Sequence, residues 1–178
     1  MKVSWSHTVL RVRDLEPMIE FYRDMLGFQV SDRGPLGPDG PEIVFMSGDP
    51  SDHHQFALLP VRTDSPESSL EHNAFRVDTV ADVKTMFDTV SNDPRCSRIM
   101  PLTHGNAVSV YFNDPEGNTI EVFADTPWHV RQPQARVWDP SLGADELLAW
   151  VESEFRNEPE FGPMDEYRAR MAQRLEEV

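Results

Sequence analysis

The stretch His7-Thr8-Val9-Leu10-Arg11-Val12 recurs later in the chain as His72-Asn73-Ala74-Phe75-Arg76-Val77. Each copy begins with histidine, carries arginine at its fifth position and ends in valine. An aspartate follows each copy, Asp14 and Asp78, and an amphipathic helical pattern follows each aspartate. A repeat this short cannot bury an apolar face alone, so the chain is expected to pair two matching halves around a common core.

The first copy alternates with the period of a β-strand, which puts His7, Val9 and Arg11 on one face of the strand. Asp14 then stands where a helix N-cap belongs, and apolar residues recur at helical spacing until Gly27. The pattern predicts a helix over about 14–26. Strands are expected near 28–32, 42–46 and 55–60, with a glycine- and proline-rich loop over 34–41.

The second half repeats this order. It predicts a strand at 71–77, a helix at 80–90 and strands near 97–102, 107–113 and 119–124. The fold class is therefore α+β, with two βαβββ modules forming a cupped mixed sheet around a metal site. Module one is expected to span residues 1–60 and module two residues 70–125, with a polar connector at 61–69.

Residues 126–178 depart from the repeat and are expected to form a C-terminal extension with two helices. The inward face of the first helix is expected to carry Leu147, Leu148, Val151 and Phe155. The second helix has an apolar stripe of Met164, Tyr167, Met171 and Leu175. The pattern indicates that the extension packs on the domain or on a partner subunit. A homo-oligomer, a dimer or higher, is expected.

Bulk composition limits the class of protein. With 178 residues and 39% hydrophobic content, the chain is long enough for one well-buried domain. A net charge of −15 argues against nucleic-acid and anionic-membrane partners. A single cysteine, Cys96, forms no internal disulfide, and no stretch approaches the length of a membrane span or resembles a secretion signal. The expected location is the cytoplasm.

The repeat places two histidines, His7 and His72, at equivalent points of two halves, and Glu121 lies near the end of the second half. Two imidazoles and one carboxylate are the ligand set that leaves one side of an iron ion open for substrate and oxygen. If the five residues 114–118 form a hairpin loop, symmetric pairing sets Tyr111 opposite Glu121. A phenol would then stand beside a metal-bound carboxylate.

The combined motifs resemble the vicinal oxygen chelate superfamily, and within it the type I extradiol catechol dioxygenases in a short, single-domain form. The resemblance covers about residues 1–125 and rests on the βαβββ order, the two strand-borne histidines, the pair His53-His54, the run Leu-Thr-His-Gly at 102–105 and the run Tyr-Phe-Asn-Asp-Pro-Glu-Gly-Asn-Thr-Ile-Glu-Val-Phe at 111–123.

This resemblance implies that His7, His72 and Glu121 bind Fe(II). It implies that His54 is an acid/base residue beside the metal and that Tyr111 forms a hydrogen bond with the bound substrate. His104 corresponds to a further histidine of the family's site, although its spacing to Tyr111 differs from the usual pattern. The implied reaction is ring cleavage of a catechol-type diol by O2, which gives a muconic semialdehyde type of product.

Other readings remain open. The chain is alternatively a non-oxidative metal enzyme of the same superfamily, such as a glyoxalase, an isomerase or a thiol transferase, or a ligand-sequestering binding protein. Tyr111 is alternatively a cross-strand packing aromatic, and His54 an exposed residue at the start of a strand. Arg11 and Arg76 share the faces of the two histidines, so each either binds an anionic substituent or pairs with an acidic side chain.

Overall fold

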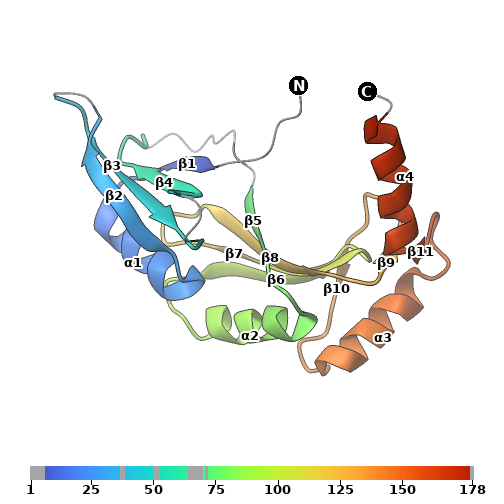
Figure 1. Cartoon of the computed structure of the whole chain (residues 1–178). Coiled ribbons are helices and arrows are strands. Elements are labelled where there is room, and N and C mark those ends of the chain that lie inside the picture. Colours follow the sequence, from blue (N-terminus) through green and yellow to red (C-terminus); the bar gives the residue numbers. More distant parts are fainter. Residues whose placement is uncertain (1–6, 37–38, 50–52, 64–69, 71, 177–178) are drawn as a thin grey trace. The chain divides into compact units, whose positions relative to one another are not determined.

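The computed structural model describes residues 7–36, 39–49, 53–63, 70 and 72–176, which divide into two compact units (Figure 1). The first unit comprises residues 1–70 together with 114–117, and the second comprises 71–113 and 118–178, within the described ranges. The connector predicted at 61–69 lies mostly outside the described residues, because only 61–63 of it are described.

The described residues of the first unit form one helix and one four-stranded sheet. Its elements are β1 (Thr8–Arg11), α1 (Leu15–Leu26), β2 (Gln29–Pro35), β3 (Glu42–Ser47) and β4 (Phe56–Leu59). The strand order is β1-β4-β3-β2, with β1 parallel to β4 and the other pairs antiparallel. The predicted helix is confirmed to within one residue, and Gly27 ends it with a left-handed φ of 74°.

Helix α1 covers one face of this sheet. Its buried side chains are Met18, Ile19, Phe21, Tyr22 and Met25, and the sheet contributes Leu10, Val44, Met46, Phe56 and Leu58. The rings of Tyr22 and Phe56 lie 4.5 Å apart across this contact. Alternation along β1 leaves Val9 46% exposed on the opposite face, which we call the open face of the first unit.

Residues 114–117 belong to the first unit and bind it through two acidic side chains. The buried Tyr22 hydroxyl donates a hydrogen bond to Asp114 Oδ2 at 3.1 Å. Burial and the nearby Asp114 carboxylate raise the pKa of Tyr22 well above its ordinary value, so the phenol stays protonated and remains a donor. Glu116 Oε2 lies 3.6 Å from both Arg13 and Arg62.

Replacing Tyr22 by phenylalanine is expected to lower the free energy of unfolding by about 2 kcal/mol, because a buried carboxylate loses one donor. Because the folded pKa of Tyr22 is raised, its contribution is complete below pH of about 10 and is lost as pH rises through the folded pKa. Denaturant unfolding at pH 7 and in alkali measures both effects. Tyr167→Phe is the matched control and should change the free energy of unfolding by less than about 0.5 kcal/mol. An equal loss of stability in both variants would contradict the role of the hydrogen bond from Tyr22 to Asp114.

The second unit repeats the order of the first. Its module consists of β5 (His72–Arg76), α2 (Val80–Ser91), β6 (Ser97–Thr103), β7 (Ala107–Asn113) and β8 (Thr119–Asp125). The sheet order β6-β7-β8-β5, with β5 parallel to β8, mirrors the order of the first sheet and confirms the two βαβββ modules. A fifth strand, β10 (Arg136–Val137), pairs with β6.

Helix α2 covers one face of the second sheet (Figure 1). A capping box at Thr79 and Asp82 begins this helix. The strand residues turned toward α2 are fully buried: Val108, Val110, Phe112, Ile120, Val122 and Ala124. The alternate residues lie on the other face, which we call the open face of the second unit.

The C-terminal residues form β9 (Trp128–His129), α3 (Ala144–Phe155), β11 (Gly162–Pro163) and α4 (Met164–Glu176). Leu147, Val151 and Phe155 of α3 are buried as predicted, and Leu148 is half-buried. Trp138 is fully buried and donates its indole N–H to the Ser109 carbonyl oxygen at 2.9 Å. Of the stripe predicted on α4, the side chains of Met171 and Leu175 lie outside the described residues.

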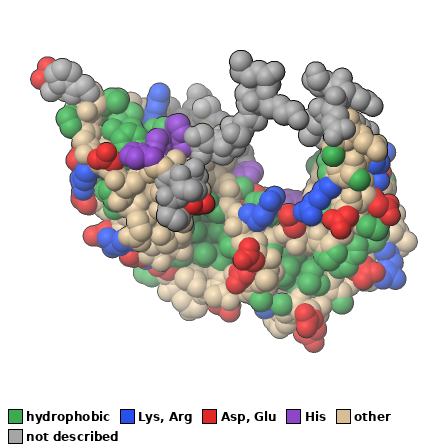
Figure 2. Space-filling view, in the orientation of Figure 1, with side chains coloured by type: hydrophobic (Ala, Val, Ile, Leu, Met, Phe, Trp, Pro, Cys, Tyr) green, Lys and Arg blue, Asp and Glu red, His purple; other side chains and the backbone are tan. Residues whose placement is uncertain are grey.

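Acidic side chains are scattered over the visible face of the protein, as the net charge of −15 implies (Figure 2). No helix in the described part of the chain is long and apolar enough to cross a membrane.

Candidate functional site

Two of the predicted metal ligands lie together on the open face of the second unit. His72 is the first residue of β5, and Glu121 is the third residue of β8. The parallel register pairs Ala74 with Glu121, and His72 shares the face of Ala74 because it lies two residues earlier in the strand. The imidazole Nε2 of His72 lies 3.3 Å from Glu121 Oε2.

Tyr111 lies directly beside this pair. The predicted hairpin register is confirmed, because β7 and β8 pair Tyr111 with Glu121 and Asn113 with Thr119. The ring of Tyr111 meets the ring of His72 edge to face, with centroids 5.5 Å apart. The phenol and the carboxylate therefore share the open face, as the sequence predicted.

His104 joins the same cluster from the segment that follows β6. Its Nδ1 lies 2.6 Å from the Gln134 carbonyl oxygen, and its Nε2 lies 3.0 Å from the Tyr111 hydroxyl. A carbonyl oxygen only accepts hydrogen bonds, so Nδ1 carries a proton and Nε2 of the neutral ring accepts from Tyr111. His104 Nε2 is also 3.8 Å from Glu121 Oε1. The different spacing along the chain does not keep His104 away from Tyr111.

Ser109 is a site residue that the sequence analysis did not single out. Its hydroxyl donates a hydrogen bond to Glu121 Oε1 at 2.7 Å, and the serine is fully buried. This bond fixes one carboxylate oxygen while the other faces His72. Strand alternation contained a signal for it, because Ser109 lies two residues before Tyr111 and therefore shares its face.

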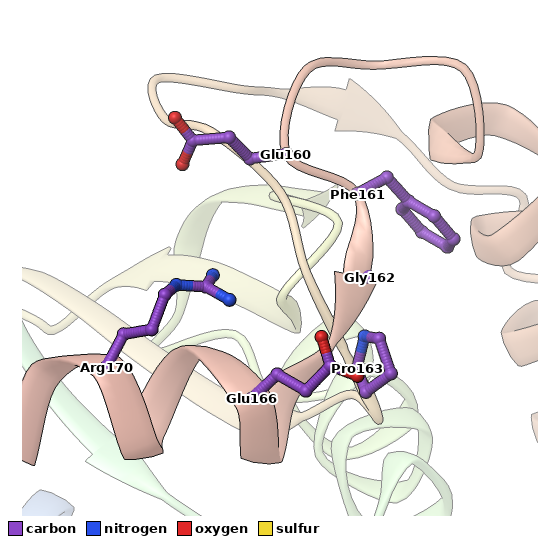
Figure 3. A pocket seen from close by; sticks show the side chains of 6 residues that line it. All are labelled: Glu160, Phe161, Gly162, Pro163, Glu166 and Arg170. Carbon is purple, nitrogen blue, oxygen red and sulfur yellow. The ribbon is translucent and has the colours of Figure 1, made fainter.

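A pocket opens over this cluster. Its lining residues are His104, Asn106, Ala107, Tyr111, Glu121, Phe123 and Gln132. Figure 3 shows a different pocket of the second unit, formed by Glu160, Phe161, Gly162, Pro163, Glu166 and Arg170, and none of the cluster residues lines it. The chemistry-bearing side chains thus gather at the first pocket.

His7 and His54 lie side by side in the first unit. Their ring centroids are 4.4 Å apart, and His54 also contacts the ring of Phe45 at 4.8 Å. The neighbouring His53 places its Nδ1 2.9 Å from Nδ1 of His54. His7 precedes β1 on the open face of the first unit, so it occupies the position that His72 holds in the second.

The three-ligand set of His7, His72 and Glu121 draws on both units and stays a prediction. Among the described residues, no group of three or more histidine, cysteine, aspartate or glutamate side chains is arranged to hold a metal ion. The structure brings His72, His104, Tyr111 and Glu121 together in one unit and His7 and His54 together in the other.

With this geometry established, the comparison with known families is informative. Residues 4–122 match the model of the Glyoxalase/Bleomycin resistance protein/Dioxygenase superfamily. The chain belongs to this superfamily. The matched residues include both copies of the repeat and all six predicted site residues.

Individual members of the superfamily give a narrower likeness. The chain is 31% identical over 130 residues to biphenyl-2,3-diol 1,2-dioxygenase 3 of Rhodococcus globerulus, a match that covers 67% of this chain and 62% of that protein. It is 26% identical over 129 residues to biphenyl-2,3-diol 1,2-dioxygenase 2 of the same organism, covering 68% and 62%. The chain thus spans less than two thirds of the length of these relatives.

A solved structure supports the fold. The glyoxylase/bleomycin resistance protein/dioxygenase domain from Frankia sp. EAN1pec matches with a TM-score of 0.59 and 18% identity, over 72% of this chain and 96% of that chain. The fold of the chain, with its two βαβββ modules, is therefore that of the superfamily.

Proposed function

We propose that this protein is an Fe(II)-dependent extradiol dioxygenase, which cleaves a catechol-type diol with O2 next to its two hydroxyl groups. The observation that carries the proposal is the cluster in which His72 and Tyr111 flank the carboxylate of Glu121. The two dioxygenases from Rhodococcus globerulus support the reaction class, since their names specify a diol as substrate.

The residue types of the proposed ligand set, two imidazoles and one carboxylate, suit a divalent metal ion. Glu121 is 7% exposed, and its Oε2 faces the imidazole Nε2 of His72 with no lysine or arginine paired to the carboxylate among the described residues. A largely buried carboxylate is stabilised by a nearby cation that offsets its charge. We propose that His7, His72 and Glu121 hold Fe(II), with residues 1–125 as the metal-binding domain and 126–178 as its extension.

Iron, when bound, would supply adjacent positions for the diol oxygens and for O2, so that the reacting groups are held together. The protein side chains handle the protons. A catechol binds through both oxygens only after losing protons, and His104, whose Nε2 lies 3.0 Å from the Tyr111 hydroxyl, is placed to receive one proton through that hydroxyl. A diol proton would pass to the Tyr111 oxygen while the Tyr111 hydrogen moves to His104 Nε2, and the Tyr111 hydroxyl would then donate to the deprotonated substrate oxygen. His54 would be the second acid/base residue.

Ser109 supports this arrangement through the carboxylate. Its hydroxyl holds Glu121 Oε1, which leaves Oε2 turned toward His72. Partners that orient a ligand in this way raise metal affinity and fix the direction of the donated lone pair. The apolar ring of Phe123 lines the same pocket and offers a surface for an aromatic substrate.

Oxygen uptake tests the proposal. Purified protein loaded with ferrous ion under argon is expected to consume one O2 per diol and to form a yellow ring-cleavage product from catechol, 3-methylcatechol or biphenyl-2,3-diol. An oxygen electrode and an absorbance trace read the reaction together. Turnover of a substrate without O2, in the presence of nickel, zinc or manganese, would instead show a non-oxidative enzyme. Tight ligand binding without any bound metal would show a binding protein.

A further inference from the structure

Arg76 lies at the edge of the candidate site, on the open face of the second unit. It is the last residue of β5 and pairs with Phe123 of β8 in the parallel register. Its guanidinium carbon lies 5.1 Å from the centroid of the Phe123 ring. Phe123 lines the pocket that contains Tyr111 and Glu121, so the guanidinium stands over one wall of that pocket.

Arg76 is paired only loosely, with the carboxylate of Asp125. Asp125 accepts a hydrogen bond from Arg168 at 3.0 Å, whereas Arg76 Nε is 3.7 Å from the same carboxylate, beyond hydrogen-bond distance. Arg168 also lies 3.6 Å from Asp165, so Asp125 is shared between two guanidinium groups and binds Arg168 more closely than Arg76. Within the described part of the chain, the Arg76 guanidinium donates no hydrogen bond, and its side chain is 66% exposed. The protein as a whole has a net charge of −15.

The spacing along the strands sets the size of a ligand that reaches from Glu121 to Arg76. Arg76 lies across from Phe123, which is two residues beyond Glu121, a separation of about 6.6 Å along the strand. Ala74, the residue between His72 and Arg76 on this face, has no side chain long enough to fill that gap. An aromatic ring with a short acidic side chain matches this span.

We propose that Arg76 recognises an anionic substituent of the substrate, so that the preferred diols are catechols with a carboxylate on a short side chain. This inference rests on the proposed function, because it places the diol at the Glu121 cluster. The planar guanidinium binds a carboxylate through two parallel hydrogen bonds, and Phe123 keeps it oriented beneath the incoming group. Arg168 leaves Arg76 available by occupying Asp125.

Paired substrates test the inference. The wild type and Arg76→Gln are compared on 3-(3,4-dihydroxyphenyl)propanoate and on uncharged 4-propylcatechol. For the anionic diol we expect Arg76→Gln to raise KM about tenfold with kcat nearly unchanged, because binding is lost equally from ground and transition states. The KM for 4-propylcatechol should stay constant. Asp125→Asn, which removes the competing carboxylate, should lower KM for the anionic diol.

Arg136→Gln is the matched control. Its guanidinium also lies over a phenylalanine ring, 5.4 Å from Phe155, and also pairs with an acidic side chain, Glu158, but Phe155, unlike Phe123, does not line the pocket. The control should leave KM for both diols unchanged. If Arg76→Gln alters both diols equally, or neither, the inference is overturned.

A binding measurement separates this inference from the proposed function. Titration calorimetry with 3-(4-hydroxyphenyl)propanoate, which has no diol to cleave, should give a Kd about tenfold higher for Arg76→Gln than for the wild type. That result supports Arg76 as the anion-binding residue even if neither diol is cleaved, in which case only the proposed reaction fails. An equal Kd in the two proteins contradicts the inference whether or not catechols are turned over.

Discussion

Replacing Glu121 by alanine is expected to lower kcat/KM for ring cleavage by roughly a thousandfold or more, with loss of bound iron. Glu121 supplies the carboxylate of the proposed ligand set, and its Oε2 lies 3.3 Å from His72. Without this carboxylate, only two imidazoles would remain to bind the divalent ion, and no ligand would balance its charge. Iron content by colorimetric assay and oxygen uptake are measured on the same preparation.

Ser109→Ala is the graded comparison for this prediction. It removes only the hydrogen bond to Glu121 Oε1, so we expect iron affinity to fall by about tenfold while added ferrous ion restores activity. His7→Ala and His72→Ala should match the loss seen in Glu121→Ala. Retention of full iron content in Glu121→Ala, with a normally folded protein, would show that the carboxylate is not a ligand.

The sheet register explains why so much of this cluster was predictable from sequence. Tyr111 and Glu121 flank a short loop, and a loop of fixed length leaves one symmetric pairing, which the structure confirms. The repeat of a strand-borne histidine gave His7 and His72 equivalent positions, and the equal strand orders of the two sheets explain that equivalence. Local periodicity therefore determines which side chains share a face.

Contacts that depend on irregular backbone were harder to predict. His104 follows β6 outside the regular pairing, and its ring is oriented by the Gln134 carbonyl oxygen thirty residues later. His129, which no sequence pattern singled out, is 7% exposed and stacks on Tyr167 with ring centroids 3.9 Å apart. These positions follow from tertiary packing of the C-terminal residues, for which strand and helix periods carry no information.

The N-terminus of α1 shows the same limit. Asp14 occupies the N-cap position as predicted, but its side chain makes no capping hydrogen bond. Instead the backbone N–H groups of Arg13 and Asp14 donate to Glu116 Oε1 at 2.6 and 3.1 Å. Glu116 lies about a hundred residues away in the chain. The N-cap pattern therefore predicted where the helix begins, but it could not predict which side chain accepts the hydrogen bonds of the backbone N–H groups there.

Replacing His54 by alanine is expected to slow turnover by roughly a hundredfold to a thousandfold while iron remains bound. His54 is proposed to transfer a proton rather than to bind the metal, and its ring packs beside His7 with centroids 4.4 Å apart. Loss of the imidazole should therefore remove an acid/base group without removing a ligand. Single-turnover kinetics and iron content are measured together, because a slow step with full iron occupancy distinguishes the two roles.

His53→Ala is the matched control, since it deletes the adjacent imidazole, whose Nδ1 lies 2.9 Å from Nδ1 of His54. That contact can orient the His54 ring but brings no second proton-transfer group to the substrate, so kcat should fall by no more than about tenfold. His7→Ala is the comparison for loss of a metal ligand, and we expect it to lose iron. If His54→Ala loses as much iron as His7→Ala, then His54 is itself a ligand, and the proton transfer assigned to it must come from the His104 and Tyr111 pair.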